Sequence, residues 1–217
     1  DSDTYIEHAS ASGSDLTETD FENRVITGQF SLNYQRTFTN HSITVLGVYE
    51  IIDYYSETVR ASRSNFLNPD FDYLFGGSST GMTNDGWATE MGRASLIGRL
   101  NYAFKNKYLL DATVRHDASA KFPSESRWGT FPSISLGWRL SEEDFIANSL
   151  SGLTNLKLRG GYSQTGNDAI GNFQYLAGYS FGPAMAYGAE TQLTIVSRGL
   201  ANPMLTWETL NITNIGL

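Results

Sequence analysis

The sequence contains no cysteine, few charged residues and no cluster of histidines. The absence of cysteine excludes disulfides, thiolate metal sites and cysteine nucleophiles. The three histidines, His8, His41 and His116, are too far apart to share the spacing of a metal-binding motif. Charged residues make up 18% of the chain, below the roughly 25% of an average soluble domain. We therefore expect no metal site and no cofactor.

Two further absences narrow the class of protein. No stretch of about 18 consecutive apolar residues is present, so no transmembrane helix is expected. No stripe of basic residues is present, so a nucleic-acid partner is not expected. The net charge of −8 is concentrated at the start, because residues 1–23 hold seven acidic and no basic residues. We interpret that segment as a solvated loop.

Alternation of apolar and polar residues is the dominant pattern that is present. In residues 26–35 one alternating set is Ile26, Gly28, Phe30, Leu32 and Tyr34, and the residues between them are polar and uncharged. Successive side chains of a strand point to opposite faces, so this pattern predicts a two-faced strand. Similar patterns predict strands over residues 43–55, 132–140 and 156–163, and a last strand is expected to begin near Trp207.

Residues 95–116 predict a hairpin with its turn at Lys105-Asn106-Lys107. If Phe104 pairs with Tyr108, then Asn101 faces Asp111 and Ser95 faces Asp117. This register places polar residues opposite polar residues and apolar residues opposite apolar residues, as stable cross-strand pairing requires.

The predicted connections alternate between short and long, so that the long ones fall on one side of the sheet. Short connections are expected at 37–41 and 105–107, and long ones over 56–92, 117–129 and 165–206. The segment 141–153 is intermediate. Its Ser141-Glu142-Glu143-Asp144 start is typical of a helix N-terminus, so we expect one or two helical turns there.

Three further features favour a membrane β-barrel over a soluble β-sandwich, which alternation alone would also allow. The predicted strands have about 10–12 residues, the length that crosses a bilayer at a tilt, whereas strands of soluble proteins have about 5–6. Aromatic residues gather beside the short turns, where a membrane interface would lie. The mid-strand charges all belong to the polar sets, so the apolar sets could face lipid.

Several motifs resemble the barrel of SusC/RagA-family TonB-linked outer-membrane proteins. The motifs are Ser95–Tyr102, Lys107–Ser119, Phe122-Pro123, Trp128–Arg139, Ser141–Glu143, Leu158–Asn167, Asn202–Glu208 and Asn214–Leu217. The resemblance is strong over residues 93–217 and weaker over 24–55. These motifs belong to the scaffold, so they indicate the family and carry no information about the cargo.

The resemblance implies an all-β fold, a transmembrane antiparallel β-barrel of about 22 strands that encloses an N-terminal plug. It implies an importer in the outer membrane of a Gram-negative bacterium, driven by the TonB complex and capped by a SusD-like lipoprotein. The implied cargo is oligosaccharide or peptide. Because the sequence has no plug or TonB box and does not start with Met, we expect residues 1–217 to be a fragment of the barrel domain. The fragment should form an open curved sheet of about seven to nine long strands with two free edges.

Candidate site residues follow from the polar sets and from aromatic residues in predicted loops. The possible ligand-path residues, expected to face the barrel lumen, are Arg99, Asp111, Arg115, Asp117, Arg139, Lys157 and Arg159. An alternative role for these seven is a hydrated wall of paired charges. The possible loop aromatics are Trp87, Phe122 and Trp128, which could stack on sugars or pack the loops together.

No catalytic residue is expected. A glycoside hydrolase needs two carboxyl groups that face each other across a sugar, which the adjacent Glu142, Glu143 and Asp144 do not provide. Two alternatives to the importer remain. One is a passive porin or barrel adhesin, and the other is a soluble β-sandwich that binds carbohydrate.

Overall fold

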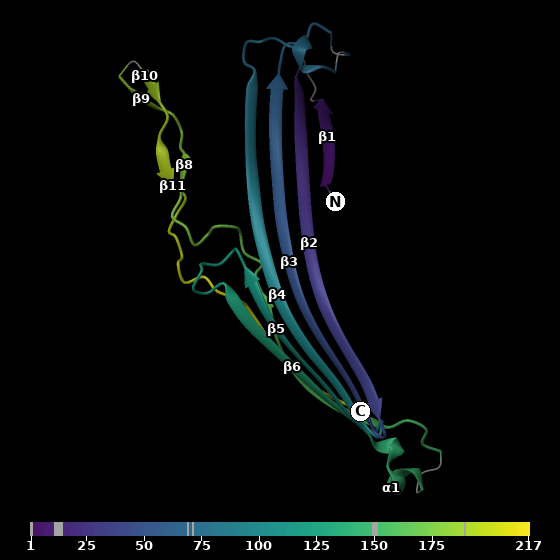
Figure 1. Ribbon diagram of the computed structural model, residues 1–217. Coiled ribbons are helices and arrows are strands. Elements are labelled where there is room, and N and C mark those ends of the chain that lie inside the picture. The colour runs from purple at the N-terminus through teal and green to yellow at the C-terminus, as the bar shows by residue number, and fades with distance from the viewer. Residues whose placement is uncertain (1, 11–14, 69, 71, 149–151, 189) are drawn as a thin grey trace. The chain divides into compact units, whose positions relative to one another are not determined.

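The protein is described here by a computed structural model that covers residues 2–10, 15–68, 70, 72–148, 152–188 and 190–217. The strands of its main sheet are β1 (Ser2–Ser10), β2 (Leu16–Phe38), β3 (His41–Arg63), β4 (Thr83–Phe104), β5 (Tyr108–Ser119), β6 (Trp128–Arg139), β7 (Lys157–Asn167) and β12 (Glu208–Gly216). Within the described residues these eight strands pair in the order β1-β2-β3-β4-β5-β6-β7-β12. Figure 1 labels β1 to β6. The linear order makes the sheet open, which confirms the prediction of an open antiparallel sheet.

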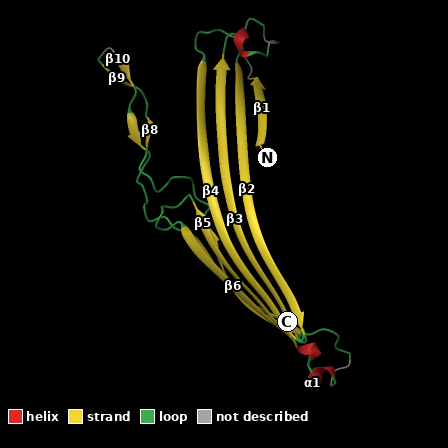
Figure 2. Cartoon of the chain, viewed as in Figure 1, coloured by secondary structure: helices red, strands yellow, loops and turns green. Residues whose placement is uncertain are grey.

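Smaller elements occupy the connections (Figure 2). They are the 3-10 helices η1 (Leu74–Gly76) and η2 (Leu140–Glu142), the helix α1 (Asp144–Ala147), and the short strands β8 (Tyr179–Phe181), β9 (Met185–Tyr187), β10 (Glu190–Gln192) and β11 (Ile195–Ser197). Strand β8 pairs with β11 and β9 pairs with β10. None of the helices in the described ranges has the length and apolar character needed to span a membrane.

The register of the β4–β5 hairpin is the one that the sequence predicts. Phe104 pairs with Tyr108, Asn101 with Asp111 and Ser95 with Asp117. The turn between them places Lys105 and Asn106 at positive φ, of 49° and 57°. Because the turn fixes the pairing at one end, every later pair of the hairpin follows from strand alternation.

Two predicted loops are wrong. Residues 16–23 of the presumed solvated loop belong to β2, and residues 2–10 form β1, which pairs with β2. Both ends of the predicted connection 56–92 also lie in strands, since β3 extends to Arg63 and β4 begins at Thr83. These stretches carry charged or polar residues in both alternating sets, so they lack the apolar-polar alternation that marks a strand with one buried face.

The helical turn expected in 141–153 is present, but its cap differs. Helix α1 begins at Asp144 with Glu143 as its N-cap residue, and no side chain caps it by a hydrogen bond. Ser141 instead lies inside η2. The acidic side chain of Glu143 is used elsewhere, as described below.

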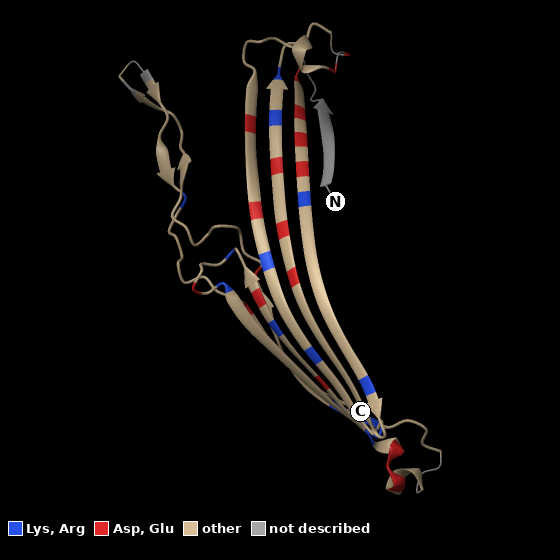
Figure 3. Ribbon diagram, in the orientation of Figure 1, with Lys and Arg blue, Asp and Glu red and all other residues tan. Residues whose placement is uncertain are grey.

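The chain divides into two units that differ in charge. Unit 1 comprises residues 1–27 and 52–92, and unit 2 comprises residues 28–51 and 93–217. In the sequence, unit 1 holds thirteen acidic and three basic residues, whereas unit 2 holds ten acidic and twelve basic residues. Figure 3 shows the acidic residues of unit 1 as bands along β2, β3 and β4. The acidity is therefore carried largely by strands, and it extends well beyond the first 23 residues.

Candidate functional site

One face of the sheet in unit 2 is apolar and uncovered. We call it the apolar face; it carries Leu100, Leu110, Ile134, Leu136 and Leu158, which alternate with polar neighbours. Leu136 is 58% exposed and Ile134 is 45% exposed. Among the described residues no second sheet packs on this face. A soluble β-sandwich would cover it, whereas a membrane protein presents such a face to lipid.

A row of aromatic rings crosses the apolar face next to the short turns. Successive ring centroids lie 5.4 Å apart from Phe38 to His41, 4.8 Å from His41 to Phe104, 6.2 Å from Phe104 to Tyr108, and 6.2 Å from Tyr108 to Trp138. The row joins five consecutive strands, β2 to β6. Aromatic rings, above all those with a polar edge, are favoured where a bilayer meets water, so the row has the composition expected of a membrane interface.

A second aromatic pair lies at the opposite end of β5 and β6. His116 stacks on Trp128 with centroids 4.6 Å apart and an interplanar angle of 11°. Along β6, Trp128 and Trp138 are the first residue and the second-to-last residue. The two residues are ten positions apart, which corresponds to ~34 Å along a strand. For a strand that crosses a membrane at a tilt of about 40°, this length spans ~26 Å along the membrane normal. The charge-free band between them therefore has the height of an outer-membrane hydrocarbon layer, about 25 Å.

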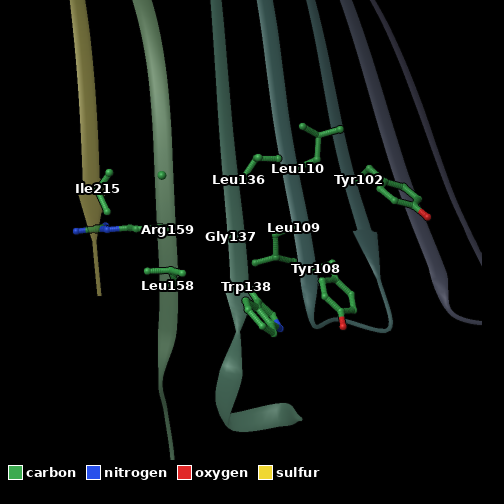
Figure 4. A pocket seen from close by; sticks show the side chains of 11 residues that line it. Tyr102, Tyr108, Leu109, Leu110, Leu136, Gly137, Trp138, Leu158, Arg159 and Ile215 are labelled. Atoms are coloured by element: carbon green, nitrogen blue, oxygen red, sulfur yellow. The ribbon is translucent and has the colours of Figure 1, made fainter.

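Glu143, in the β6–β7 connection, is linked by hydrogen bonds to the end of the aromatic row. Its carboxylate accepts hydrogen bonds from the Tyr108 hydroxyl at 2.8 Å and from the Trp138 indole Nε1 at 2.9 Å. The ammonium of Lys107 donates a third at 3.3 Å. Figure 4 shows Tyr108 and Trp138 side by side near their turns. The hydrogen bonds from Trp138, Tyr108 and Lys107 stabilise the ionised carboxylate and hold the pKa of Glu143 below its usual value.

We expect Glu143→Gln to weaken the pH dependence of stability. Because the pKa of Glu143 is lower in the folded than in the unfolded protein, its carboxylate stabilises the fold above the unfolded pKa, and this stabilisation is lost as the pH falls through the folded pKa. Thermal unfolding of the full-length protein should thus lose less stability between about pH 5 and pH 3 in the variant than in the wild type. Glu142→Gln is the matched control. Equal slopes in the wild type and Glu143→Gln would contradict this role.

An apolar groove of about 820 Å³ lies across β5, β6, β7 and the end of β12. Its lining includes Leu110, Leu136 and Leu158, with Tyr108 and Trp138 at the end near the turns (Figure 4). Most lining residues belong to the apolar face, although Arg159 and two others belong to the opposite alternating set. The groove is an uncovered depression in the apolar face and not an enclosed cavity.

The opposite face of unit 2 carries the charges, and we call it the polar face. Arg99 forms an ion pair with Asp111 at 2.5 Å, and Asn101 donates to the same carboxylate at 2.6 Å. Arg115 forms an ion pair with Asp117, two residues further along β5, at 3.1 Å. Four of the seven predicted ligand-path residues are thus joined in two pairs. Such half-exposed pairs contribute only about 0–1 kcal/mol each to stability.

The remaining three predicted ligand-path residues lie at the ends of β6 and β7 that are on the same side of the sheet as the short turns. Arg139 ends β6, Lys157 begins β7, and these two residues are direct cross-strand partners. Arg159 lies two residues beyond Lys157, so it shares the polar face with it. The structure therefore places all seven candidates on one face of the sheet.

The structure shows a buried polar cluster that the sequence does not predict. The carboxylate of Asp168, directly after β7, receives two hydrogen bonds from Arg93, at 2.5 and 3.0 Å, and one from Ser119 at 2.8 Å. The ammonium of Lys121 donates to the Asp168 backbone carbonyl at 3.1 Å. Burial alone would raise the pKa of Asp168, but the hydrogen bonds of Ser119 and Arg93 outweigh it and leave that pKa below its usual value.

An aromatic cluster packs beside the strand ends in unit 2. The ring centroids of Phe122 and Phe131 each lie 5.2 Å from that of Trp207. Phe122 is fully buried and Phe131 is 5% exposed. Trp207 Nε1 donates to the Arg127 carbonyl at 2.9 Å. This cluster joins the connection 120–127 to the last residue before β12, so the long loops are packed against the strands that they connect.

For two of the three predicted loop aromatics, the prediction that they lie in loops is wrong. Trp87 lies within β4 and Trp128 is the first residue of β6, because both strands begin earlier than the sequence pattern indicates. Trp128 packs on His116, and Phe122 packs inside the aromatic cluster. Trp87 is the most exposed of the three residues, at 56%, and Trp128 follows at 46%.

Comparisons with known proteins agree on one family. A family model described as TonB dependent receptor-like, β-barrel, matches residues 1–217. TonB-dependent receptor P39 of Formosa agariphila is 34% identical over 85% of this chain and 18% of its own length. TonB-dependent receptor SusC of Bacteroides thetaiotaomicron is 41% identical over 60% of this chain and 13% of its own length.

A solved structure shares the fold. The structure of the RagAB peptide transporter superposes with a TM-score of 0.80 at 24% identity, and covers 93% of this chain and 22% of that chain. The chain thus spans about a fifth of the length of these relatives. The strand order, the charge-free band between aromatic rows and the family match all agree. The chain belongs to the family of TonB dependent receptor-like β-barrels.

Proposed function

We propose that this chain forms part of the barrel wall of an active importer in the outer membrane of a Gram-negative bacterium. The observation that carries the proposal is the division of the sheet into two faces. The apolar face has a charge-free band between aromatic rows, and the polar face has ion-paired charges. Such a wall can lie between lipid on one side and a hydrated path on the other. The family match favours a TonB-dependent importer over a passive porin or adhesin.

The cargo proposed is a nutrient such as an oligosaccharide or a peptide. The relatives named SusC and the RagAB peptide transporter support this class of cargo and a SusD-like lipoprotein as partner. Residues 1–217 would belong to the barrel domain of a longer protein. Energy would come from the TonB complex, which would act through another part of that protein.

In this proposal the chain performs no covalent chemistry. Its role is to bind and guide cargo along the polar face, where Arg99, Asp111, Arg115 and Asp117 provide alternating charges that are already paired. The adjacent carboxylates of the β6–β7 connection have a structural use, because Glu143 is engaged by Tyr108, Trp138 and Lys107.

The test is uptake by cells of the source bacterium. Deleting the gene of the full-length protein should abolish growth on its cargo, found by screening defined oligosaccharides and peptides, and dissipating the proton-motive force should block uptake in the wild type. Uptake that continues without the proton-motive force would indicate a passive porin and contradict the proposal.

A further inference from the structure

Three cations on the polar face differ from their neighbours in lacking a partner. Arg99 and Arg115 each form an ion pair with an aspartate of β5. The side chains of Arg139, Lys157 and Arg159 form neither a hydrogen bond nor an ion pair with any residue that the structure describes. Within the described part of the chain, the end of the polar face near the short turns therefore carries positive charge that no acidic side chain pairs.

The position of two of these cations is unfavourable for the sheet itself. Arg139 and Lys157 are direct cross-strand partners. Like charges directly opposite each other destabilise a pair of strands. Proteins break such local rules chiefly at functional or strained sites. The pair therefore points to a ligand of opposite charge.

Two glycines leave space for the side chains of these cations. A Cβ atom on Gly137 would lie 2.9 Å from Cε of Lys157, and a Cβ atom on Gly216 would lie 2.8 Å from Nε of Arg159. The absence of side chains at both positions lets the two long cationic side chains lie flat along the sheet. Figure 4 shows Arg159 extending from β7 across β12. Any larger residue at 137 or 216 would displace them.

The cations border a hollow of suitable size. Lys157 and Arg159 line a depression of about 430 Å³ together with Asn101, Asp111 and Ser135. The volume falls within the range of about 300–1,000 Å³ that is usual for small-ligand sites. Asp111 is already bound by Arg99 and Asn101, so the cations in the hollow meet no free carboxylate there.

We propose that this hollow is a binding site for a carboxylate group of the cargo, held by Lys157 and Arg159 with Arg139 nearby. The inference rests on the proposed importer function, because it assumes that cargo reaches the polar face. An ammonium and a guanidinium suit a carboxylate because both donate charge-assisted hydrogen bonds to its oxygens. The cargo class is therefore narrowed to acidic peptides or oligosaccharides that contain uronic acids.

The test measures binding to the purified full-length protein in detergent. The probes are a glutamate-rich peptide and a uronic-acid oligosaccharide, each compared with a neutral twin of the same length. At least one acidic probe should bind about tenfold or more tightly than its twin, and the double variant Lys157→Gln/Arg159→Gln should lose that preference. Lys105→Gln, which removes a nearby cation outside the hollow, should retain it. No preference for either acidic probe, or a preference that survives in the double variant, would overturn the proposal.

A second measurement distinguishes a carboxylate of the cargo from a carboxylate of the protein itself. If the cations were instead paired with an acidic side chain elsewhere in the full-length protein, the double variant would leave that carboxylate unpaired. Its thermal midpoint without ligand would then fall by several degrees, and the cargo site would be refuted; we expect the midpoint to stay unchanged. Because binding is measured without transport, uptake that fails while acidic probes still bind would contradict only the importer function.

Discussion

Replacing Ile134 with arginine should lower the free energy of unfolding of the full-length protein by about 2–4 kcal/mol and reduce its amount in the outer membrane. Ile134 lies near the middle of β6 on the apolar face, six positions after Trp128 and four before Trp138, and it is 45% exposed. A charge that faces lipid at the membrane centre costs about 2–4 kcal/mol. A barrel domain with a typical stability of about 5–15 kcal/mol loses a large part of it. The measurement is the free energy of unfolding in lipid vesicles, together with the amount of folded protein in the outer membrane.

The neighbouring substitution Ser133→Arg is the matched control. Ser133 pairs with Thr113 and Ser163 on the polar face. An arginine there meets water, so its effect on the free energy of unfolding should be within about 0.5 kcal/mol. Equal effects of the two substitutions would show that the two faces do not meet different solvents.

Phe122→Ala should give the largest loss of stability outside the membrane band. Phe122 is fully buried against Trp207, in the cluster that Phe131 completes. Removing a buried phenylalanine ring costs about 3–5 kcal/mol, since it loses apolar burial and leaves a cavity. The connection 120–127 should then become sensitive to protease. Limited proteolysis and denaturant unfolding measure the two effects.

Phe181→Ala provides the comparison for that experiment. Phe181 lies in β8, within the β7–β12 connection, and is 79% exposed. Its removal should change the free energy of unfolding by less than about 0.5 kcal/mol. If Phe122→Ala were equally mild, the aromatic cluster would not hold the connections to the strand ends.

The part of the fold that the sequence predicts best is the part whose two faces meet different surroundings. The register of the β4–β5 hairpin follows from alternation and from the turn at Lys105 and Asn106. The aromatic row follows from the positions of Phe104 and Tyr108 beside that turn. In each case one alternating set is apolar, so a shift by one residue would expose the wrong set.

Strand stretches with polar residues on both faces gave no such pattern. Glu18, Asp20 and Glu22 belong to one alternating set of β2, and Thr17 and Thr19 belong to the other. Hydropathy alone cannot distinguish such a strand from a loop. Its formation depends on backbone pairing with β1 and β3, which is a long-range property of the sheet.

The Asp168 cluster could not be predicted from the sequence for a different reason. Arg93 and Ser119, which bind its carboxylate, lie 75 and 49 residues away along the chain. Only the strand order brings the start of the β7–β12 connection next to the middle of β4 and the end of β5. By contrast, the seven polar-face candidates could be assigned to one face by counting residues, although their pairing in the structure could not.

The most direct test of the central claim is the solvent that meets each face of β6. Because residues 1–217 contain no cysteine, a single cysteine introduced at each position from Ser133 to Leu136 is the only thiol of this part of the protein, and any cysteine elsewhere in the full-length protein is first replaced by serine. A water-soluble thiol reagent should label Ser133→Cys and Ser135→Cys, and should leave Ile134→Cys and Leu136→Cys unlabelled in intact outer membranes. Labelling without alternation, or with the opposite alternation, would contradict a barrel wall with lipid on the apolar face and water on the polar face.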